Sequence, residues 1–349
     1  MKIVKLLLYP IAALYNLGTR FRNYLYNIGQ KPSFEFDTTV IVVGNLNVGG
    51  SGKTPMIEYL IHLLMEQFAV VTLSRGYKRE TTGYRLATDA DDAHTIGDEP
   101  LQLYRKFRKQ IEVVVGEDRA IAIPHILKEF PETDIILLDD ALQHRSVKPQ
   151  LAVLVTEFSN PFYLDFVLPL GGLREARVGA ARADIIVVTK CSAHLSREEQ
   201  RIMTQAIHRY SGLKPVFFSH IEYGGPIAFG KPGPMTKNAI LVSGIAMPGQ
   251  LIDFCESQHT VLKHFDFPDH HRYSLGDLVT IEHFCNSLSD PFVILTTEKD
   301  MVKLIEPDFK PFVERWPWFC IPIKQEFLQD GLKFDKLILG SVINPPGTK

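Results

Sequence analysis

Long apolar runs are missing from this chain of 349 residues, and no stretch of about 20 consecutive apolar residues predicts a membrane-spanning helix. Cysteine is also scarce: the chain has four, Cys191, Cys255, Cys285 and Cys320. The nearest two, Cys255 and Cys285, are 30 positions apart (285 − 255), so no closely spaced pair predicts a metal knuckle or redox motif. We therefore expect reduced, mostly buried thiols, which suits a reducing compartment.

The sequence also lacks an excess of positive charge. Its 38 Lys and Arg stand against 40 Asp and Glu, a net charge of −2, so we expect no nucleic-acid partner held by an overall basic field. Apolar residues (45%) and charged residues (22%) are near the average for globular proteins, which excludes a disordered or fibrous chain. At about 150 residues per domain, the length favours two domains.

Acidic residues are absent from residues 1–34, the N-terminal segment. Its basic residues are Lys2, Lys5, Arg20, Arg22 and Lys31. Residues 6–17 (LLLYPIAALYNL) are mostly apolar, too few to cross a bilayer but enough to lie along its surface. We favour an amphipathic helix at a membrane interface. The alternatives are a helix packed on the protein's own core and a secretory signal, which lacks a small-x-small cleavage site here.

A glycine-rich loop follows a predicted strand. Val40–Val43 is a β-branched run, residues 44–55 read GNLNVGGSGKTP, and residues 56–67 have apolar positions at helical spacing. The amides of such a loop, at the positive end of a helix, can surround the β- and γ-phosphates of a nucleotide. In this P-loop pattern the lysine contacts phosphate and the next hydroxyl binds Mg²⁺. The predicted phosphate-binding residues are Asn47, where the generic pattern has glycine, Val48, Gly49, Gly50, Ser51, Gly52, Lys53 and Thr54, the last also a predicted Mg²⁺ ligand.

A second predicted strand ends in two carboxylates. Residues 134–140 (DIILLDD) have four continuous aliphatic residues before Asp139 and Asp140, as expected of a strand covered on both faces. One of these carboxylates would hold the Mg²⁺ or its water shell. Arg75 and Arg119 follow other predicted strands and are candidates for binding anionic groups. Alternating strands and helices predict an α/β fold with a mostly parallel sheet flanked by helices, as in P-loop NTPases.

Phosphoryl transfer to an alcohol needs a group that accepts the hydroxyl proton. Two segments offer one: residues 97–100 (GDEP), which begin a predicted helix, and residues 267–273 (FPDHHRY). The carboxylates of GDEP could equally be ordinary partners of the helix dipole. The consecutive residues of the DHH triplet do not easily face one metal ion. A carboxylate paired with a histidine, however, suits acid–base catalysis.

Eight motifs resemble, in order and spacing, those of the tetraacyldisaccharide 4'-kinase family: GGSGKTP, SRGY, GDEP, DDALQH, GGLREA, SGIAMP, FPDHHRY and TTEKD. The resemblance implies a P-loop kinase that uses ATP and Mg²⁺ to phosphorylate the 4'-hydroxyl of a tetraacylated glucosamine disaccharide 1-phosphate. It also implies a peripheral enzyme on the cytoplasmic face of a bacterial inner membrane, which meets its acylated substrate at the bilayer surface. We expect a monomer.

The resemblance further implies catalytic roles by motif position. Asp98 corresponds to the catalytic base, supported by a histidine of the DHH triplet, with His270 favoured over His271. Lys53 would contact the transferred phosphate.

Metal and substrate positions follow from the same resemblance. Glu99 and Asp139 match carboxylates associated with Mg²⁺, and Asp140 is a further candidate. The residues implied around the phosphates or the disaccharide are Arg75, Tyr77, Arg119, His144, Arg174 and Glu175, with His271 as an additional candidate. Ala141 and Gly172 depart from the family's usual DDGLQH and PLRE segments.

Glycine and proline cluster in residues 223–238, where we place an inter-domain linker. The predicted units are residues 1–34 at the membrane interface, residues 35–222 as a P-loop kinase domain and residues 239–349 as a smaller C-terminal α/β domain. The GDEP and DHH motifs then fall on opposite sides of the linker. We therefore expect an active site in a cleft between the two units, with the carboxylate and the histidine joined on closure.

Two other functions fit part of the pattern. A membrane-associated ATPase or GTPase switch would account for the P-loop, the paired carboxylates and the N-terminal segment, but not for FPDHHRY. A soluble small-molecule kinase would fit if the N-terminal helix belonged to the protein's core. Dependence of activity on the acyl chains separates that kinase from one that acts on a lipid.

Overall fold

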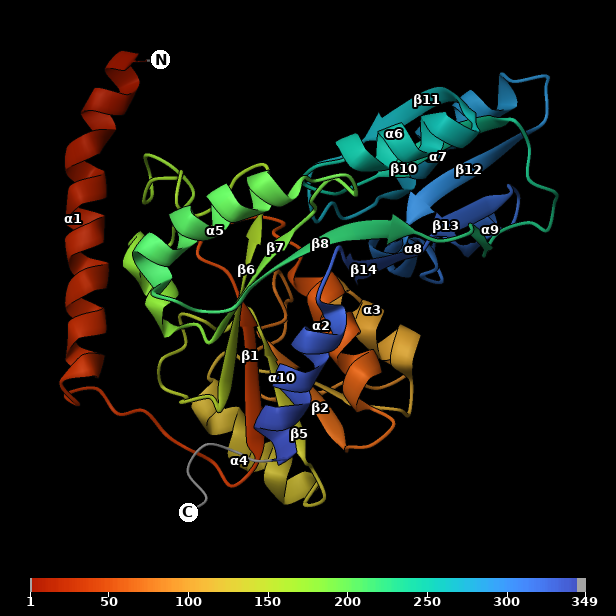
Figure 1. Ribbon diagram of the computed structural model, residues 1–349. Helices are drawn as coiled ribbons and strands as arrows, with labels where there is room; N and C mark the ends of the chain where they lie inside the picture. The colour runs from red at the N-terminus through yellow and green to blue at the C-terminus, as the bar shows by residue number, and fades with distance from the viewer. Residues whose placement is uncertain (1, 344–349) are drawn as a thin grey trace.

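Two β-sheets organise the residues that the computed structural model describes, 2–343, with side chains from residue 8 onward (Figure 1). The larger sheet has, in spatial order, β14 (Ile323–Phe327), β8 (Val216–Tyr223), β7 (Ile185–Thr189), β6 (Leu151–Glu157), β1 (Thr39–Gly44), β5 (Ile135–Asp139), β2 (Val70–Ser74), β4 (Glu112–Val115) and β3 (Arg85–Leu86). The smaller sheet has β11 (Thr260–Asp266), β10 (Asn238–Ser243), β12 (Phe292–Thr297), β13 (Trp318–Ile321) and β9 (Ile227–Ala228). Pairing is parallel except at β14, β3 and β9, so the predicted mostly parallel α/β fold is confirmed.

Helices cover both faces of the larger sheet, and together they form the larger unit. On one face lie α2 (Lys53–Leu64), α3 (Asp98–Phe107) and α10 (Gly331–Ile343), and on the other α4 (Arg119–Glu129) and α5 (Arg197–Ser211). The strand sequence explains this, because β1 reads TVIVVG and is buried throughout. Alternate residues of β1 contribute to the two opposite cores, as expected of a strand between helical layers.

The smaller unit repeats this layered plan on the second sheet. Helix α6 (Gly249–Gln258) packs on one face, and α7 (Leu275–Asn286) and α9 (Lys310–Val313) pack on the other. Helix α8 (Glu298–Leu304) lies at the junction of the two units, where it contacts α3. The four cysteines are free and buried, as predicted.

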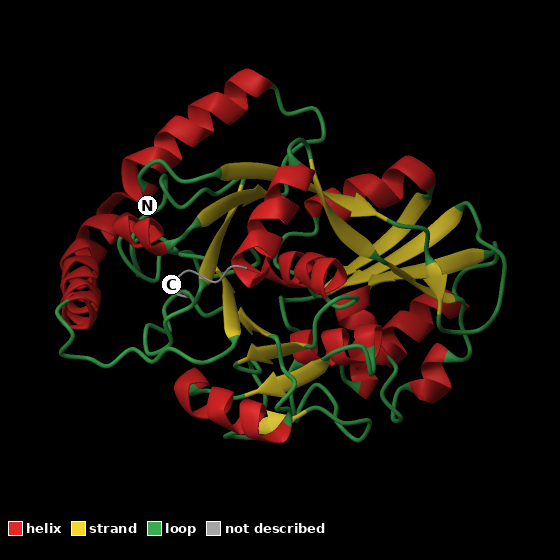
Figure 2. Cartoon of the chain, turned by 60° about the horizontal axis from the view of Figure 1, so that its bottom comes forward, coloured by secondary structure: helices red, strands yellow, loops and turns green. Residues whose placement is uncertain are grey.

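The chain crosses between the units twice. Strand β8 leads out of the larger sheet, and β14 returns antiparallel to it, with Tyr223 opposite Ile323 (Figure 1). Helix α10 follows β14 and packs in the larger unit, where Phe334 contacts Phe217. Figure 2 shows helices (red) packed around the strands (yellow). The sequence-based division differs, because it assigns all of residues 239–349 to the smaller unit and places β9 in the linker. The return depends on the pairing of β14 with β8, which is far away in the sequence, so no local sequence pattern predicts it.

Helix α1 (Lys2–Asn27) runs along the outside of the larger unit (Figure 1). One side of it is held by polar contacts, among them the Tyr15 hydroxyl to the Arg174 carbonyl (2.8 Å) and Asn23 to Glu175 (2.8 Å). Several of its large apolar side chains are exposed, including those of Leu14 (70%) and Phe21 (60%). Most of the large apolar side chains of this helix that the structure describes, from residue 8 onward, therefore lie outside the protein's core. Within residues 2–343 no helix combines the length and apolar character needed to cross a membrane.

Candidate active site

The glycine loop, residues 45–52, connects β1 to α2 and is closed by contacts with the neighbouring strand end. Asn45 donates to the Ser51 hydroxyl (2.7 Å), and the Thr189 hydroxyl donates to the Ser51 carbonyl (2.7 Å). Gly52 has φ +84°, and a Cβ there would lie 3.2 Å from the Thr189 side chain, so glycine is required. No side chain caps α2 at Gly52, which leaves the first amides of the helix available to an anion.

Carboxylates face this loop from the end of β5, because β5 pairs parallel with β1 and both strands end at the same edge of the sheet. Lys53 Nζ lies 3.8 Å from Asp140 Oδ1, and Arg174 donates to both oxygens of Asp140 at 2.8 Å. Although burial opposes the shift, the charges of Lys53 and Arg174 lower the pKa of Asp140. Burial, reinforced by the charge of Glu99, raises the pKa of Asp139 to about 7.

The oxygen atoms beside the loop suit a magnesium ion held largely by phosphate and water. Asp139 Oδ1 is buried and has no hydrogen-bond partner, and Thr54, Glu99 and Asp140 line the same space. No group of three or more His, Cys, Asp or Glu side chains among the described residues forms a ready metal site. Mg²⁺ in kinases usually keeps several waters and needs only one or two protein oxygens. The residues present therefore fit Mg²⁺ better than a metal that requires a full protein cage.

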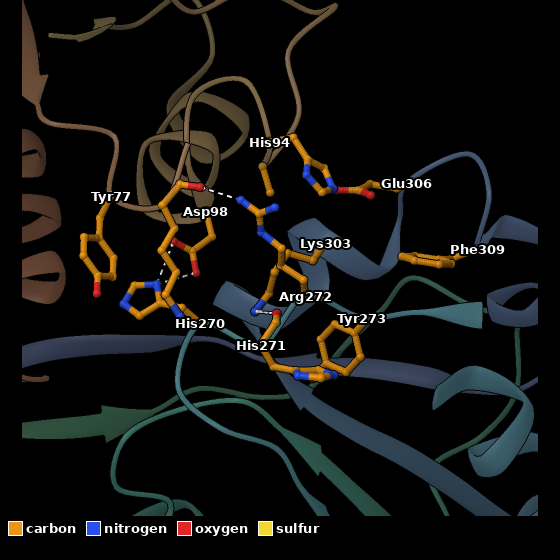
Figure 3. Close-up of a pocket in the computed structure, with 12 residues that line it drawn as sticks. Tyr77, His94, Asp98, His270, His271, Arg272, Tyr273, Lys303, Glu306 and Phe309 are labelled. Carbon is orange, nitrogen blue, oxygen red and sulfur yellow. Dashed lines mark hydrogen bonds and ion pairs between the residues drawn. The ribbon is translucent and has the colours of Figure 1, made fainter. Parts of the chain in front are cut away.

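Asp98 and His270 form a hydrogen-bonded pair across the two units (Figure 3). Asp98 is the first residue of α3, and His270 Nδ1 lies 3.0 and 2.9 Å from its two carboxylate oxygens. Burial alone would favour the protonated acid, but the His270 hydrogen bond and the charge of Lys299 outweigh it and lower the pKa of Asp98 to about 2. The contact expected on closure is thus already made in this structure.

The glycine loop and His270 line one cavity of about 830 Å³ between the units. Asp98 itself lines an adjoining pocket of about 30 Å³, shared with Tyr77 and His270 (Figure 3). The sequence-predicted residues that line the large cavity are Val48, Gly49, Gly50, Ser51, Gly52, Lys53, Thr54, Arg75, Tyr77, Glu99, Arg119, Asp139, Asp140, His144, Arg174 and His270.

Two basic side chains in the cavity wall, Arg119 and His144, have pKa values lowered by burial. Arg119 is fully buried and donates to the carbonyls of Gly116 (2.7 Å) and Asp139 (3.3 Å), and burial lowers its pKa to about 10. Burial and the nearby charge of Arg119 lower the pKa of His144 to about 4. His144 is therefore neutral at neutral pH. Arg119 holds the backbone at the end of β5 through its hydrogen bond to the Asp139 carbonyl.

Four sequence-predicted residues do not line the large cavity: Asp98, which lines the adjoining pocket, and Asn47, Glu175 and His271. The Asn47 side chain donates to Asp165 (2.8 Å), and Glu175 is buried in an ion pair with Arg182 (2.6 Å). His271 contacts Asp277 (3.0 Å) and stacks on Phe267, and its ring lies beside Tyr273, away from His270 (Figure 3). Asn47 and Glu175 contact Asp165 and Asn23, which are 118 and 152 positions away, and motif position does not reveal such contacts.

Sequence reasoning also missed residues that the structure places at the cavity. Lys190, after β7, donates to the Gly50 carbonyl (2.5 Å), and its position at a strand end was the available signal. Lys299 belongs to TTEKD, a motif to which the sequence assigned no chemistry. Tyr223 and Ile323, on the two crossing strands, give the cavity an apolar wall that only the topology reveals.

Comparison with known proteins gives one consistent result. The family model described as tetraacyldisaccharide-1-P 4'-kinase matches residues 4–342. The tetraacyldisaccharide 4'-kinase of Flavobacterium johnsoniae is 39% identical over 345 residues, covering 97% of each chain. That of Bacteroides fragilis is 38% identical, covering 96% of this chain and 92% of its own. The solved structure of LpxK from Aquifex aeolicus in complex with ATP is 28% identical with a TM-score of 0.74, covering 97% of this chain and 99% of its own.

Proposed function

This chain belongs to the tetraacyldisaccharide-1-P 4'-kinase family, and from that membership we propose how its residues divide the work of the reaction. It is an ATP-dependent kinase of lipid A biosynthesis that phosphorylates the 4' position of a tetraacyldisaccharide 1-phosphate. The observation that carries the assignment of roles is that the glycine loop and His270 line one cavity, and that His270 bonds Asp98 in the pocket that adjoins it. This arrangement allows donor phosphate and acceptor alcohol to meet.

Asp98 accepts the proton of the 4'-hydroxyl. The sugar oxygen forms a bond to the γ-phosphorus while the bond from that phosphorus to the β–γ bridging oxygen breaks, and ADP leaves. A carboxylate whose pKa is about 2 does not deprotonate a sugar alcohol beforehand, so we infer that proton transfer accompanies formation of the oxygen–phosphorus bond. His270 orients the carboxylate from its Nδ1 side.

The glycine loop and Lys53 hold the phosphates. Loop amides and the Lys53 ammonium would stabilise the charge that spreads over the transferred phosphoryl group. Thr54, Asp139 and Glu99 would hold Mg²⁺, with Asp140 kept close by Lys53 and Arg174. Mg²⁺ held there would supply positive charge that offsets the charge on the phosphate oxygens.

Helix α1 would dock the enzyme on the cytoplasmic face of the inner membrane. Its exposed Leu14, Leu17 and Phe21 can enter the interface, and each basic residue near anionic lipid contributes about 1 kcal/mol. The Tyr15–Arg174 contact joins this helix to the wall of the cavity, which suits a substrate that stays in the bilayer. Residues 2–7 add Lys2 and Lys5, whose side chains lie outside the described residues.

Membrane docking is tested with vesicles that contain anionic lipid. Leu14→Glu combined with Phe21→Glu should lower the fraction that floats with the vesicles while transfer to a detergent-dispersed substrate persists. Ile202→Glu, at an exposed position on α5, is the matched control. Equal flotation of the double variant and the control would contradict the proposed docking role.

The reaction itself is tested with γ-labelled ATP and tetraacyldisaccharide 1-phosphate. We expect label at the 4' position of a bisphosphate product and far less with the same headgroup stripped of acyl chains. Equal rates on both acceptors would favour a soluble small-molecule kinase. We expect a monomer to suffice, because Lys53, Asp98 and His270 come from one chain, and sedimentation of the active enzyme checks this.

A further inference from the structure

Lys299 occupies a central place beside the Asp98–His270 pair. It is the second residue of α8, and its side chain is 17% exposed. Its Nζ lies 3.2 Å from Asp269 Oδ1 and 3.2 Å from His270 Nε2. It also lies 3.6 Å from Glu99 Oε1 and 3.9 Å from Asp98 Oδ2. One ammonium thus contacts both the start of α3 and the DHH loop of the smaller unit.

The chemistry of an ammonium determines which nitrogen of His270 carries the proton. Lys299 has donors and no acceptor, so the Nε2 atom 3.2 Å from it is assigned as an acceptor without hydrogen; the Asp269 carboxylate also faces Nε2 but is farther away, at 3.7 Å. The neutral ring then carries its proton on Nδ1 and donates it to the Asp98 carboxylate. Without Lys299 the ring could adopt the opposite tautomer, in which an unprotonated Nδ1 faces Asp98.

The backbone around His270 also needs to be held. His270 has φ +56°, a left-handed conformation that costs energy for a residue other than glycine. Lys299 contacts this residue and the one before it, Asp269. The lysine is itself fixed, because Thr297 caps α8 and Glu298 pairs with Lys106 of α3 (3.0 Å).

We propose that Lys299 is a positioning residue for phosphoryl transfer: it fixes the His270 tautomer and holds His270 against Asp98. The proposal rests on the role proposed above for the Asp98–His270 pair. It gives the TTEKD motif a function, as the part of the smaller unit that sets the orientation of a base in the larger unit. The alternative is that Lys299 is only one of several ion pairs that hold the units together.

A double-mutant cycle separates these roles. We expect Lys299→Met to lower kcat about 10- to 100-fold while KM for ATP changes less than about threefold. In the His270→Ala background, the same change should cost less than about threefold, because the residue through which Lys299 acts is gone. Lys299→Arg keeps the charge and the donors and should retain most of the activity.

Arg105→Met is the matched control, because Arg105 donates from α3 to the Val302 carbonyl of α8 without touching the pair. We expect this variant to keep kcat within about threefold. Thermal melting and ATP binding are measured for every variant, and Lys299→Gln replaces Lys299→Met in the cycle if the latter does not fold.

Each outcome has a definite meaning. An equal loss from Lys299→Met with and without His270, or an equal loss in the Arg105 control, would overturn the positioning role and leave an inter-unit ion pair. If His270→Ala left kcat unchanged, the role of the pair in the proposed function would fail instead. If His270→Ala lowered kcat strongly and the fold-losses of the two single variants multiplied in the double variant, only the Lys299 proposal would be refuted.

Discussion

The glycine loop and the Asp98–His270 pair illustrate two ways of building half of an active site. The loop is a run of consecutive residues fixed by one strand, one helix and the end of β7. The pair joins residues 172 positions apart that belong to different units. In the proposed mechanism, phosphate binding is therefore set by local geometry, whereas activation of the acceptor depends on how the two units dock. Mutations should separate the two halves.

The largest effect is expected from Asp98→Ala. Loss of a general base typically lowers kcat by about 10² to 10⁴. ATP binding should persist, because Asp98 bonds His270 and does not line the cavity that the glycine loop lines. Steady-state kinetics with isothermal titration of ATP would check this, and loss of ATP affinity comparable to the loss of kcat would mean that Asp98 serves the nucleotide rather than the alcohol.

A slightly smaller effect on kcat, but a different pattern, is expected from Lys53→Ala. Removing one preorganised donor to transferring charge costs about 10²- to 10³-fold in kcat. Unlike Asp98→Ala, this change should also weaken ATP binding, because Lys53 would contact the ground-state phosphates. Near-normal turnover, measured in the same assay, would contradict the assignment of the loop as the phosphate site.

The stability of the larger unit should depend on pH, because His144 of that unit lies in the cavity wall. Its pKa is lowered to about 4 by burial and by Arg119, whereas in the unfolded chain the imidazole titrates near 6.5. The unfolded state therefore binds the proton first, so stability falls as pH drops from 6.5 toward 4, by at most about 3 kcal/mol. His144→Gln should flatten this dependence. Denaturant unfolding at pH 7, 6 and 5 measures it, and parallel curves for both proteins would refute the account.

The smallest effect is expected from Arg272→Ala at the junction of the units. Arg272 donates to the Lys78 carbonyl (2.6 Å) and pairs with Glu80 (2.5 Å), but both side chains are exposed. Loss of such a pair should cost less than about 1 kcal/mol of stability. We expect kcat to fall a few-fold with ATP affinity unchanged. Arg201→Ala, which breaks an exposed pair within α5, is the control and should change neither quantity.

The conformation of the glycine loop and its two flanking strands could be predicted from the sequence, because its signals are local. The β-branched run of β1, the glycines of the loop and the aliphatic run before Asp139 each determine their own conformation. The parallel order of β1 and β5 then brings Lys53 and Asp140 together without further information.

The remaining features depend on contacts that no short segment encodes. Glu175 is buried against Arg182 and Asn23, so its motif position indicates a site although its environment is structural. Lys299 acquires its partners only when α8 docks on α3. The return of the chain through β14 is an edge pairing with β8, which local pattern does not predict.

That return makes the smaller unit an insertion whose two ends are neighbours. Tyr223 and Ile323 lie opposite each other, so a tight turn could replace everything between them and leave β8 and β14 as a hairpin. The larger unit that is left after this deletion would keep the glycine loop, Asp139 and the core around α10. We expect this shorter protein to bind nucleotide but to lack His270, the residue proposed to orient Asp98 toward the acceptor.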